Sequence, residues 1–216
     1  MTAQLIDGKM IAQQVREEVA AKVAQRIAVG KLKPTLATVL VGDRADSATY
    51  VSSKQKACAE LGMGSVSQNL PADISQEDLE RIIKSLNDDQ TAHGILVQLP
   101  LPSQLNEERV LQLISVEKDV DGFSPINIGR LAQRGREPLF VPCTPNGCMY
   151  LLDHAGVSIE GANAVVLGRS NIVGMPAALL LMSRNATVTV CHSRTKDLPG
   201  IARAADILIV AIGKAE

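Results

Sequence analysis

The stretch HGILVQLPLP, residues 93–102, contains a short apolar strand that two prolines bring to an end. Ile95, Leu96 and Val97 form a continuous apolar run, which is typical of a parallel strand that helices cover on both faces. Proline lacks the N–H that a strand ladder needs, so the strand cannot continue past Pro100. Because parallel strands are joined by long crossovers that are usually helical, this run predicts an α/β fold.

Gln98 stands at the end of this strand. In open parallel sheets, ligands bind outside the carboxyl ends of the strands, so an amide at this position is placed to face a substrate. The alternative is a strand-end glutamine that only hydrogen-bonds a neighbouring loop. Partners elsewhere in the chain have to decide between the two.

Composition narrows the class of protein. A length of 216 residues suits one or two domains, and 46% hydrophobic with only 2% aromatic residues predicts an aliphatic core. The net charge of −1, without a basic block, argues against nucleic acid as a principal partner. The N-terminus has no apolar leader and no window approaches 18 uninterrupted apolar residues, so we expect a cytoplasmic protein with no membrane partner.

The four cysteines are scattered and form no C-x-x-C pair, and the chain has only three histidines. A structural zinc site is therefore not expected, and reduced thiols are the simpler interpretation.

Periodicity predicts alternating helices and strands along the whole chain. Ser75 with Asp78 resembles a capping box, Asp46 or Ser47 is a candidate cap of an earlier helix, and Thr144 followed by proline marks another helix start. We expect strands at 35–42, 65–70, 95–99, 164–167, 187–191 and 207–211, and helices at 9–29, 46–61, 75–86, 106–114, 144–156, 173–183 and 201–204.

The segment 117–145 is too long and too polar at its start to be a mere connector, so we expect it to carry function. Its Asp119 and Asp121 could form half of a metal site, but no further ligand cluster has suitable spacing. A single carboxylate that accepts hydrogen bonds from a substrate N–H pair is simpler, and a solvated turn around Gly122 is the alternative. We place a domain boundary near Val141.

Tyr50 and Lys54 are four residues apart on a predicted helix and so project from one face. They could be a catalytic couple, or a surface tyrosine packed on a lysine stem. Their helix follows a strand that ends in glycine, which puts its first turns at the same sheet edge as Gln98.

The second half offers AVVLGRSNIVGMP, residues 164–176, in which a strand leads through Gly168 and Gly174 into a helix. Glycine lets the backbone approach a pyrophosphate and the helix N-terminus supplies N–H donors, although a tight turn without a ligand is the alternative. NAD enzymes place a carboxylate roughly 20 residues further on. Here the chain has Ser193 and Arg194 instead, which suit the 2′-phosphate of NADP.

Six segments together carry a family resemblance. They are YVSSK (50–54), GILVQLPLP (94–102), EKDVDG (117–122), CTPNG (143–147), VVLGRSNIVGMP (165–176) and TVTVCHSRT (187–195). In order along the chain, they resemble the bifunctional methylenetetrahydrofolate dehydrogenase/methenyltetrahydrofolate cyclohydrolase family. The resemblance implies an α/β protein with an N-terminal three-layer parallel-sheet catalytic domain, residues 1–141, followed by a Rossmann-like NADP-binding domain, residues 142–216.

The resemblance also implies an activity and roles for residues. The activity is oxidation of 5,10-methylenetetrahydrofolate with NADP, followed by hydrolysis of the methenyl product to 10-formyltetrahydrofolate. Lys54 would be catalytic, Gln98 would support it, Tyr50 would stack on the aminobenzoate ring and Asp121 would hold the pterin. The resemblance assigns NADP binding to Gly168, Arg169, Ser170 and Ser193. We add Arg194, because its cationic side chain suits the 2′-phosphate. A homodimer formed through the second domain is implied as well.

Family members continue well beyond position 216, so the NADP-binding domain is expected to be incomplete at its C-terminal end. Two other functions stay open. One is a different NADP-linked α/β dehydrogenase with the two-domain plan of shikimate dehydrogenase. The other is a non-catalytic chain that binds folate or a partner subunit without turnover.

Overall fold

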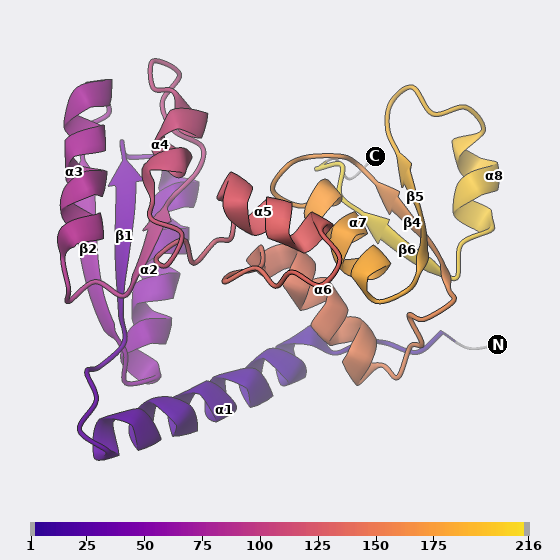
Figure 1. Ribbon diagram of the computed structural model, residues 1–216, viewed down its shortest axis with the longest axis horizontal. Helices are drawn as coiled ribbons and strands as arrows, with labels where there is room; N and C mark the ends of the chain where they lie inside the picture. Colours follow the sequence, from indigo (N-terminus) through magenta and orange to yellow (C-terminus); the bar gives the residue numbers. More distant parts are fainter. Residues whose placement is uncertain (1–2, 214–216) are drawn as a thin grey trace. The chain divides into compact units, whose positions relative to one another are not determined.

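A computed structural model describes residues 3–213 and has the predicted mixed α/β architecture (Figure 1). The chain forms two compact units. Lys9–Val120 make up one unit, and residues 3–8 join residues 121–213 in the other. We call them the first and the second unit and describe each by itself.

The first unit contains a parallel sheet with the strand order β2-β1-β3. Its elements are α1 (Gly8–Ala28, whose first residue belongs to the second unit), β1 (Thr35–Val41), α2 (Ala45–Glu60), β2 (Gly64–Leu70), α3 (Gln76–Asp88), β3 (Gly94–Val97) and α4 (Glu107–Leu113). All seven lie within a few residues of the elements that periodicity predicts. In the register of the sheet, Val39 of β1 is aligned with Gln68 of β2 and Val97 of β3.

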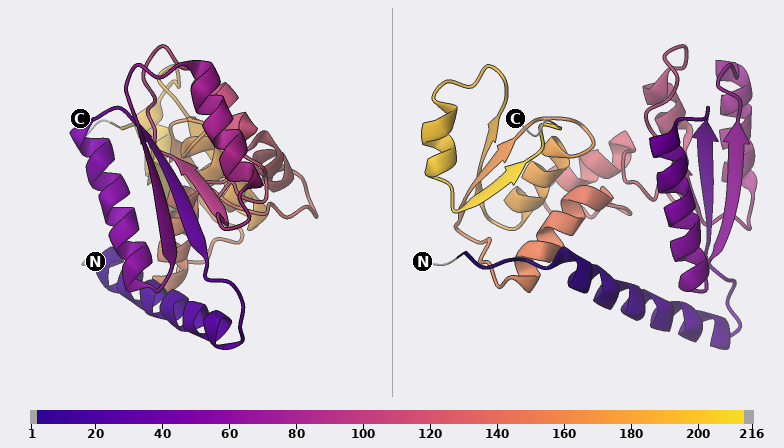
Figure 2. Two further views of the ribbon diagram at one scale, coloured as in Figure 1. Left: turned by 90° about the vertical axis from the view of Figure 1, so that its left-hand side faces the viewer. Right: turned by 180° about the vertical axis from the view of Figure 1, so that it is seen from behind.

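Helices cover both faces of this sheet. Val39 and Ile95 contribute to a core cluster with Leu79 and Ile83 of α3, and all four are fully buried. Because side chains alternate across a strand, β1 also presents residues to the opposite face, where α2 lies (Figures 1 and 2). The predicted three-layer arrangement is therefore confirmed.

The strand β3 is held on its other side by the segment that follows α4. The N–H of Ile95 donates to the carbonyl of Lys118 at 2.7 Å, and Ile95 forms a parallel bridge with Asp119. The ammonium of Lys118 donates to the carbonyls of Leu86, Asn87 and Asp89 at 2.7–3.0 Å, so it caps the C-terminus of α3. These contacts fix the chain on the sheet two residues before Asp121.

The second unit contains another parallel sheet, with the order β5-β4-β6. Its elements are α5 (Pro125–Ala132), α6 (Cys143–His154), β4 (Asn163–Leu167), α7 (Gly174–Ser183), β5 (Thr187–Cys191), α8 (Leu198–Arg203) and β6 (Ile207–Val210). Met149 of α6 and Leu181 of α7 pack with Val166 in its core, and α8 lies on the side of the sheet away from α7 (Figures 1 and 2). This is the strand-helix alternation expected of half a dinucleotide-binding fold.

The helix α5 was not predicted, because the segment 117–145 was interpreted as an irregular loop. Its start carries a recognisable signal: the Ser124 hydroxyl accepts from the N–H of Ile126, and Pro125 occupies the first turn. Asn127, 1% exposed, then accepts from the N–H groups of Leu139 and Phe140 and holds the returning chain.

The structure divides the chain at a different position from the predicted domain boundary. The predicted boundary lies near Val141, whereas the division by contacts follows Val120. Gly122 has φ +69°, and a Cβ there would lie 2.8 Å from the backbone of Val141 and Pro142. The segment 121–141 therefore belongs with the second unit in this structure.

Three predicted helix starts were wrong in detail. Arg44 is the N-cap residue of α2 and Pro142 that of α6, and neither helix has a side-chain cap, so Asp46, Ser47 and Thr144 do not act as caps. The helix α8 begins at Leu198 rather than residue 201, because Asp197 caps the N–H of Gly200 and Pro199 is tolerated in the first turn.

Within residues 3–213, no helix has the length and apolarity needed to cross a membrane. Over the same residues, no group of three or more His, Cys, Asp or Glu side chains is arranged to hold a metal ion.

Candidate active site and cofactor-binding loops

The carboxyl edge of the first sheet brings β1, α2 and β3 together. After β1, Gly42 adopts φ +82°, which favours glycine, and the chain turns into α2. After β3, the N–H of Gln98 donates to the carbonyl of Val39 at 2.9 Å. The first turns of α2 and the side chain of Gln98 thus emerge at one edge, as the sequence predicts.

Lys54 and Gln98 are in direct contact at this edge. Lys54 Nζ donates to Gln98 Oε1 at 3.2 Å, and Gln98 Nε2 donates to the carbonyl of Leu99 at 2.9 Å. A lysine ammonium can only donate and a carbonyl can only accept, so the two contacts define which way the amide faces. The Gln98 amide therefore donates to its own loop through Nε2 and accepts from Lys54 through Oε1. Both side chains are half-buried.

Tyr50 lies one helical turn before Lys54, on the same face of α2. Its side chain is 64% exposed. An aromatic face this open can stack on a flat ligand, and the same exposure fits a surface tyrosine. The stacking role of Tyr50 stays a prediction.

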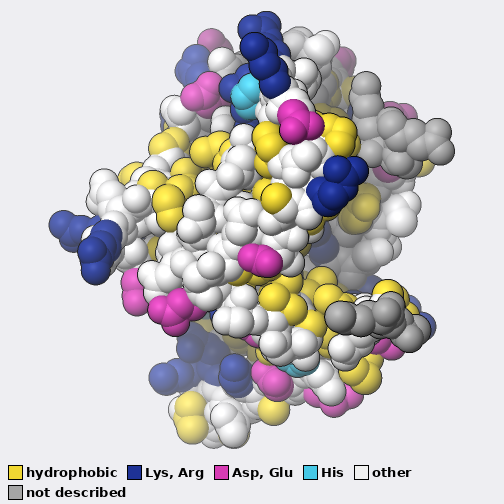
Figure 3. All heavy atoms as spheres, turned by 90° about the vertical axis from the view of Figure 1, so that its right-hand side faces the viewer, with side chains coloured by type: hydrophobic (Ala, Val, Ile, Leu, Met, Phe, Trp, Pro, Cys, Tyr) yellow, Lys and Arg dark blue, Asp and Glu magenta, His cyan; other side chains and the backbone are white. Residues whose placement is uncertain are grey.

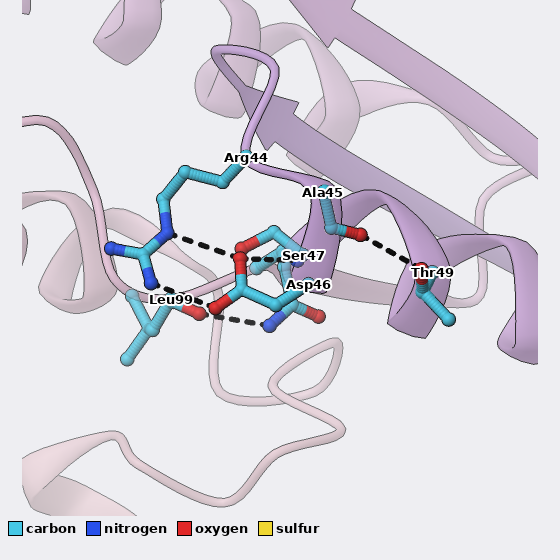
Figure 4. Close-up of polar contacts among 7 residues, drawn as sticks. Arg44, Ala45, Asp46, Ser47, Thr49 and Leu99 are labelled. Atoms are coloured by element: carbon cyan, nitrogen blue, oxygen red, sulfur yellow. Dashed lines mark hydrogen bonds and ion pairs between the residues drawn. The ribbon is translucent and has the colours of Figure 1, made fainter.

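An ion pair that the sequence analysis missed lies at the same edge. Arg44 Nη2 lies 2.7 Å from Asp46 Oδ2 and its Nε 3.2 Å from Oδ1 (Figure 4). Asp46 Oδ1 also accepts from the N–H of Ser47 at 2.8 Å. The hydrogen bond from Arg44, then that from Ser47, lowers the pKa of Asp46 from 3.8 to about 2. The available signal was an Arg-x-Asp spacing that begins two residues after the strand-ending Gly42.

Replacing Arg44 with methionine is expected to raise the pKa of Asp46 from about 2 back toward 3.8. Since the pKa in the folded state is below the ordinary value, any stabilisation from this pair is present above about pH 4 and is lost as the pH falls toward 2. Carboxyl ¹³C NMR titration measures the change. The control is Arg81→Met, which removes the separate pair with Asp78. An Asp46 midpoint that stays near 2 in Arg44→Met would show that the guanidinium is not the cause.

The two acidic residues of the KDVDG segment belong to different compact units. Asp119 is 2% exposed and sits in the bridge beside β3, within the first unit. Asp121 is half-buried and belongs to the second unit, where Gly122 makes the turn that follows it. The chain turns here, but Gly122 is buried, so the solvated turn of the alternative interpretation does not form, and the role of Asp121 in binding a pterin stays a prediction.

In the second unit, the loop between β4 and α7 is built on two glycines. A Cβ on Gly168 would overlap the carbonyl oxygen of Ala211, and one on Gly174 would lie 2.6 Å from the carbonyl carbon of Gly168 and 2.9 Å from the nitrogen of Arg169. The Ser170 hydroxyl accepts from the N–H groups of Val173 and Gly174, both at 3.2 Å. The loop is therefore too tight for larger residues at either glycine.

Exposed polar side chains follow both β4 and β5, which are neighbours in the sheet. Arg169 and Ser170 follow β4, and Ser193 and Arg194 follow β5. Guanidinium and hydroxyl groups are donors that suit phosphate, and residues 192–196 include no carboxylate. These residues fit a dinucleotide that carries an additional phosphate on its ribose.

A groove of about 870 Å³ lies elsewhere in the second unit, between the segment 131–141 and the C-terminal part of α7. None of the predicted site residues lines it.

Comparison with known proteins decides the family. Residues 6–121 match the model of the tetrahydrofolate dehydrogenase/cyclohydrolase catalytic domain, and residues 142–216 match that of the NAD(P)-binding domain of the same family. The chain belongs to this family. The predicted recognition and the predicted order of a catalytic and a nucleotide-binding domain are thus confirmed, and the shikimate dehydrogenase-like alternative is set aside. Residues 122–141 lie outside both matches, so the boundary near Val141 stays a prediction.

Several relatives are similar over almost the whole chain. Bifunctional protein FolD 2 of Arabidopsis thaliana is 55% identical over 99% of this chain and 72% of its own length. The Moorella thermoacetica FolD protein is 53% identical over 100% of this chain and 76% of its own. The chain spans 58% of the length of chloroplastic FolD 4 of Arabidopsis thaliana, which is 54% identical.

Solved structures of the family have the same fold. FolD of Trypanosoma brucei, in complex with NADP and an inhibitor, superposes with a TM-score of 0.94 at 43% identity and covers 99% of this chain and 73% of its own. FolD of Campylobacter jejuni gives a TM-score of 0.92 at 45% identity, over 96% of this chain and 73% of its own.

Proposed function

We propose that the chain is a bifunctional enzyme of one-carbon metabolism. It oxidises 5,10-methylenetetrahydrofolate with NADP to the methenyl compound and hydrolyses that compound to 10-formyltetrahydrofolate. The observation that carries the proposal is the hydrogen bond between Lys54 Nζ and Gln98 Oε1 in the family's catalytic domain. The tight glycine loop of the NAD(P)-binding domain supports the oxidative half.

The oxidative step makes few demands on acid-base groups. The methylene carbon of the substrate lies between two nitrogens, so loss of a hydride leaves a cation delocalised over N–C–N, and no proton has to leave. Bound NADP supplies the hydride acceptor. The protein then has to position the methylene carbon, which is the task we assign to Tyr50 and Asp121.

The hydrolytic step needs a base, because water loses a proton as it attacks the methenyl carbon. Lys54 in its neutral form takes that proton while the new C–O bond forms. The bond from the carbon to N5 of the pterin then breaks as N5 takes a proton from the Lys54 ammonium, and the hydroxyl loses its proton to water as the formyl C=O bond forms. The carbonyl oxygen of Gln98 accepts a hydrogen bond from both the amine and the ammonium form of Lys54. Gln98 therefore holds Lys54 in place throughout the proton transfer without adding charge.

Replacing Gln98 with glutamate tests this division of roles. A carboxylate beside Lys54 Nζ stabilises the ammonium form, so we expect the hydrolysis rate near neutral pH to fall by about 10-fold or more and its pH profile to move to higher pH. Decay of the methenyl chromophore measures the rate. Gln90→Glu is the control, because it adds the same charge on an exposed residue before β3, at the amino edge of the sheet. An unchanged pH profile in Gln98→Glu would contradict the role of Gln98.

On the cofactor side, Gly168, Arg169 and Ser170 would hold the pyrophosphate region of NADP, and Ser193 with Arg194 would hold its 2′-phosphate. NADP is preferred over NAD because a carboxylate for the ribose hydroxyl is absent from residues 192–196. The NADP complex of the Trypanosoma brucei relative supports this choice. Comparable affinity and turnover with NAD would overturn it.

We also propose a homodimer in the cytoplasm, with the dimer formed through the NAD(P)-binding domain, residues 142–216. The support for the dimer is the family resemblance. Sedimentation velocity measures the oligomeric state, and a monomer at micromolar concentration would contradict it.

Each activity can be tested by itself. With methenyltetrahydrofolate alone, we expect the chromophore to decay faster than in buffer at the same pH. With methylenetetrahydrofolate and NADP, we expect NADPH to form. Binding of both ligands without either reaction would identify the chain as a non-catalytic folate-binding protein.

A further inference from the structure

The turn after β5 is closed by hydrogen bonds between its first and last residues. The N–H of His192 donates to Thr195 Oγ1 at 2.8 Å, and the N–H of Thr195 donates to the carbonyl of His192 at 2.9 Å. His192 and Thr195 are half-buried, whereas Ser193 and Arg194 between them are exposed. The two outer residues therefore build the turn, and the two inner ones face solvent.

The imidazole of His192 adds a third contact inside the turn. Its Nδ1 accepts from the N–H of Arg194 at 3.2 Å. Only an unprotonated Nδ1 can accept, so this contact requires the neutral ring with its hydrogen on Nε2. The contact fixes the backbone at the residue whose guanidinium projects into solvent.

The exposed residues of the turn have the chemistry of a phosphate site. A hydroxyl and a guanidinium stand next to each other, and Lys196, also exposed, follows. In the space-filling view of this side of the molecule, Lys or Arg side chains lie beside a histidine at the upper end (Figure 3). The loop from β5 to α8 lies at the upper edge of the second unit in Figure 1.

We propose that His192 and Thr195 are positioning residues for cofactor choice: they hold the turn in the form that presents Ser193 and Arg194 to the 2′-phosphate of NADP. The inference rests on the proposed function. NAD carries a hydroxyl in place of the 2′-phosphate. Its binding therefore does not depend on how the turn places Ser193 and Arg194. The turn therefore sets the ratio of NADP to NAD affinity, and its two outer residues act without touching the phosphate.

Two matched pairs of variants in the full chain test the inference. Thr195→Val removes the hydroxyl at nearly constant shape, and Thr195→Ser retains it. His192→Asn places an amide oxygen close to where Nδ1 lies, and His192→Gln places its polar atoms nearer to Nε2. Isothermal titration calorimetry with NADP and, separately, with NAD measures the dissociation constants, and thermal unfolding monitors folding.

We expect Thr195→Val and His192→Gln to weaken NADP binding by about 10-fold or more, while NAD affinity changes less than about threefold. Thr195→Ser and His192→Asn should keep NADP affinity within about threefold of the parent chain. An equal loss for NADP and NAD, or no loss in the Val and Gln variants, would overturn the inference. A parent chain that binds NAD as well as NADP would instead refute the proposed cofactor.

Discussion

Replacing Lys54 with methionine is expected to lower the rate of methenyltetrahydrofolate hydrolysis by at least about 100-fold, because a positioned general base contributes roughly 10²–10⁴-fold to such a step. Methionine matches the lysine side chain as far as Cε but has no amine to take the proton from water. The hydrogen bond to Gln98 Oε1 at 3.2 Å disappears with it. Decay of the methenyl chromophore under single-turnover conditions measures the loss.

The matched control is Lys56→Met, two residues further along α2. Lys56 is exposed, and its Nζ lies 3.9 Å from Glu60 Oε1 in an exposed ion pair. Its replacement should therefore leave the hydrolysis rate within about twofold of the parent. A Lys54→Met protein that hydrolyses the methenyl compound at the parent rate would remove Lys54 from the mechanism. Formation of NADPH should suffer less than hydrolysis in Lys54→Met, since no proton has to be removed in the hydride step.

Replacing Gly174 with alanine is expected to lower NADPH formation by about 100-fold, because misplacement of a bound group by about 1 Å can cost that much. The added Cβ would lie 2.6 Å from the carbonyl carbon of Gly168 and 2.9 Å from the nitrogen of Arg169. Both obstacles are backbone atoms that cannot rotate away, so the loop between β4 and α7 has to open. The dissociation constant for NADP and the rate of NADPH formation measure the effect.

Gly147→Ala on α6 is the control, since a Cβ there meets nothing within 4 Å and alanine favours helix. Hydrolysis of added methenyltetrahydrofolate should persist in Gly174→Ala, because Lys54 and Gln98 belong to the other compact unit. If Gly174→Ala binds NADP like the parent, the tight glycine loop is not a cofactor loop.

The alternation of helices and strands was predictable because it rests on local patterns. The buried run of β3, the capping box at Ser75 and the helical periodicity of α3 each act over a few residues. The helix α5 was missed because its start at Ser124 and Pro125 is short and lies in a polar segment. The division of the chain into units depends on contacts between distant residues, such as the packing of α5 against α7, which no local pattern encodes.

The candidate site was predictable in part. Strand direction placed Gln98 and the first turns of α2 at one edge, but only the structure shows that the Gln98 amide is shared between Leu99 and Lys54. The ion pair of Arg44 and Asp46 was missed, because a spacing of two residues gives no contact until the turn conformation is known.

We propose that one chain carries out both reactions in sequence. The most direct measurement mixes the protein with methylenetetrahydrofolate and NADP and records NADPH and the methenyl chromophore together over time. We predict that NADPH rises steadily while the methenyl compound stays at a low level and 10-formyltetrahydrofolate accumulates. If no NADPH forms although both ligands bind, or if the methenyl compound accumulates in step with NADPH and decays only as fast as it does in buffer, the claim is wrong.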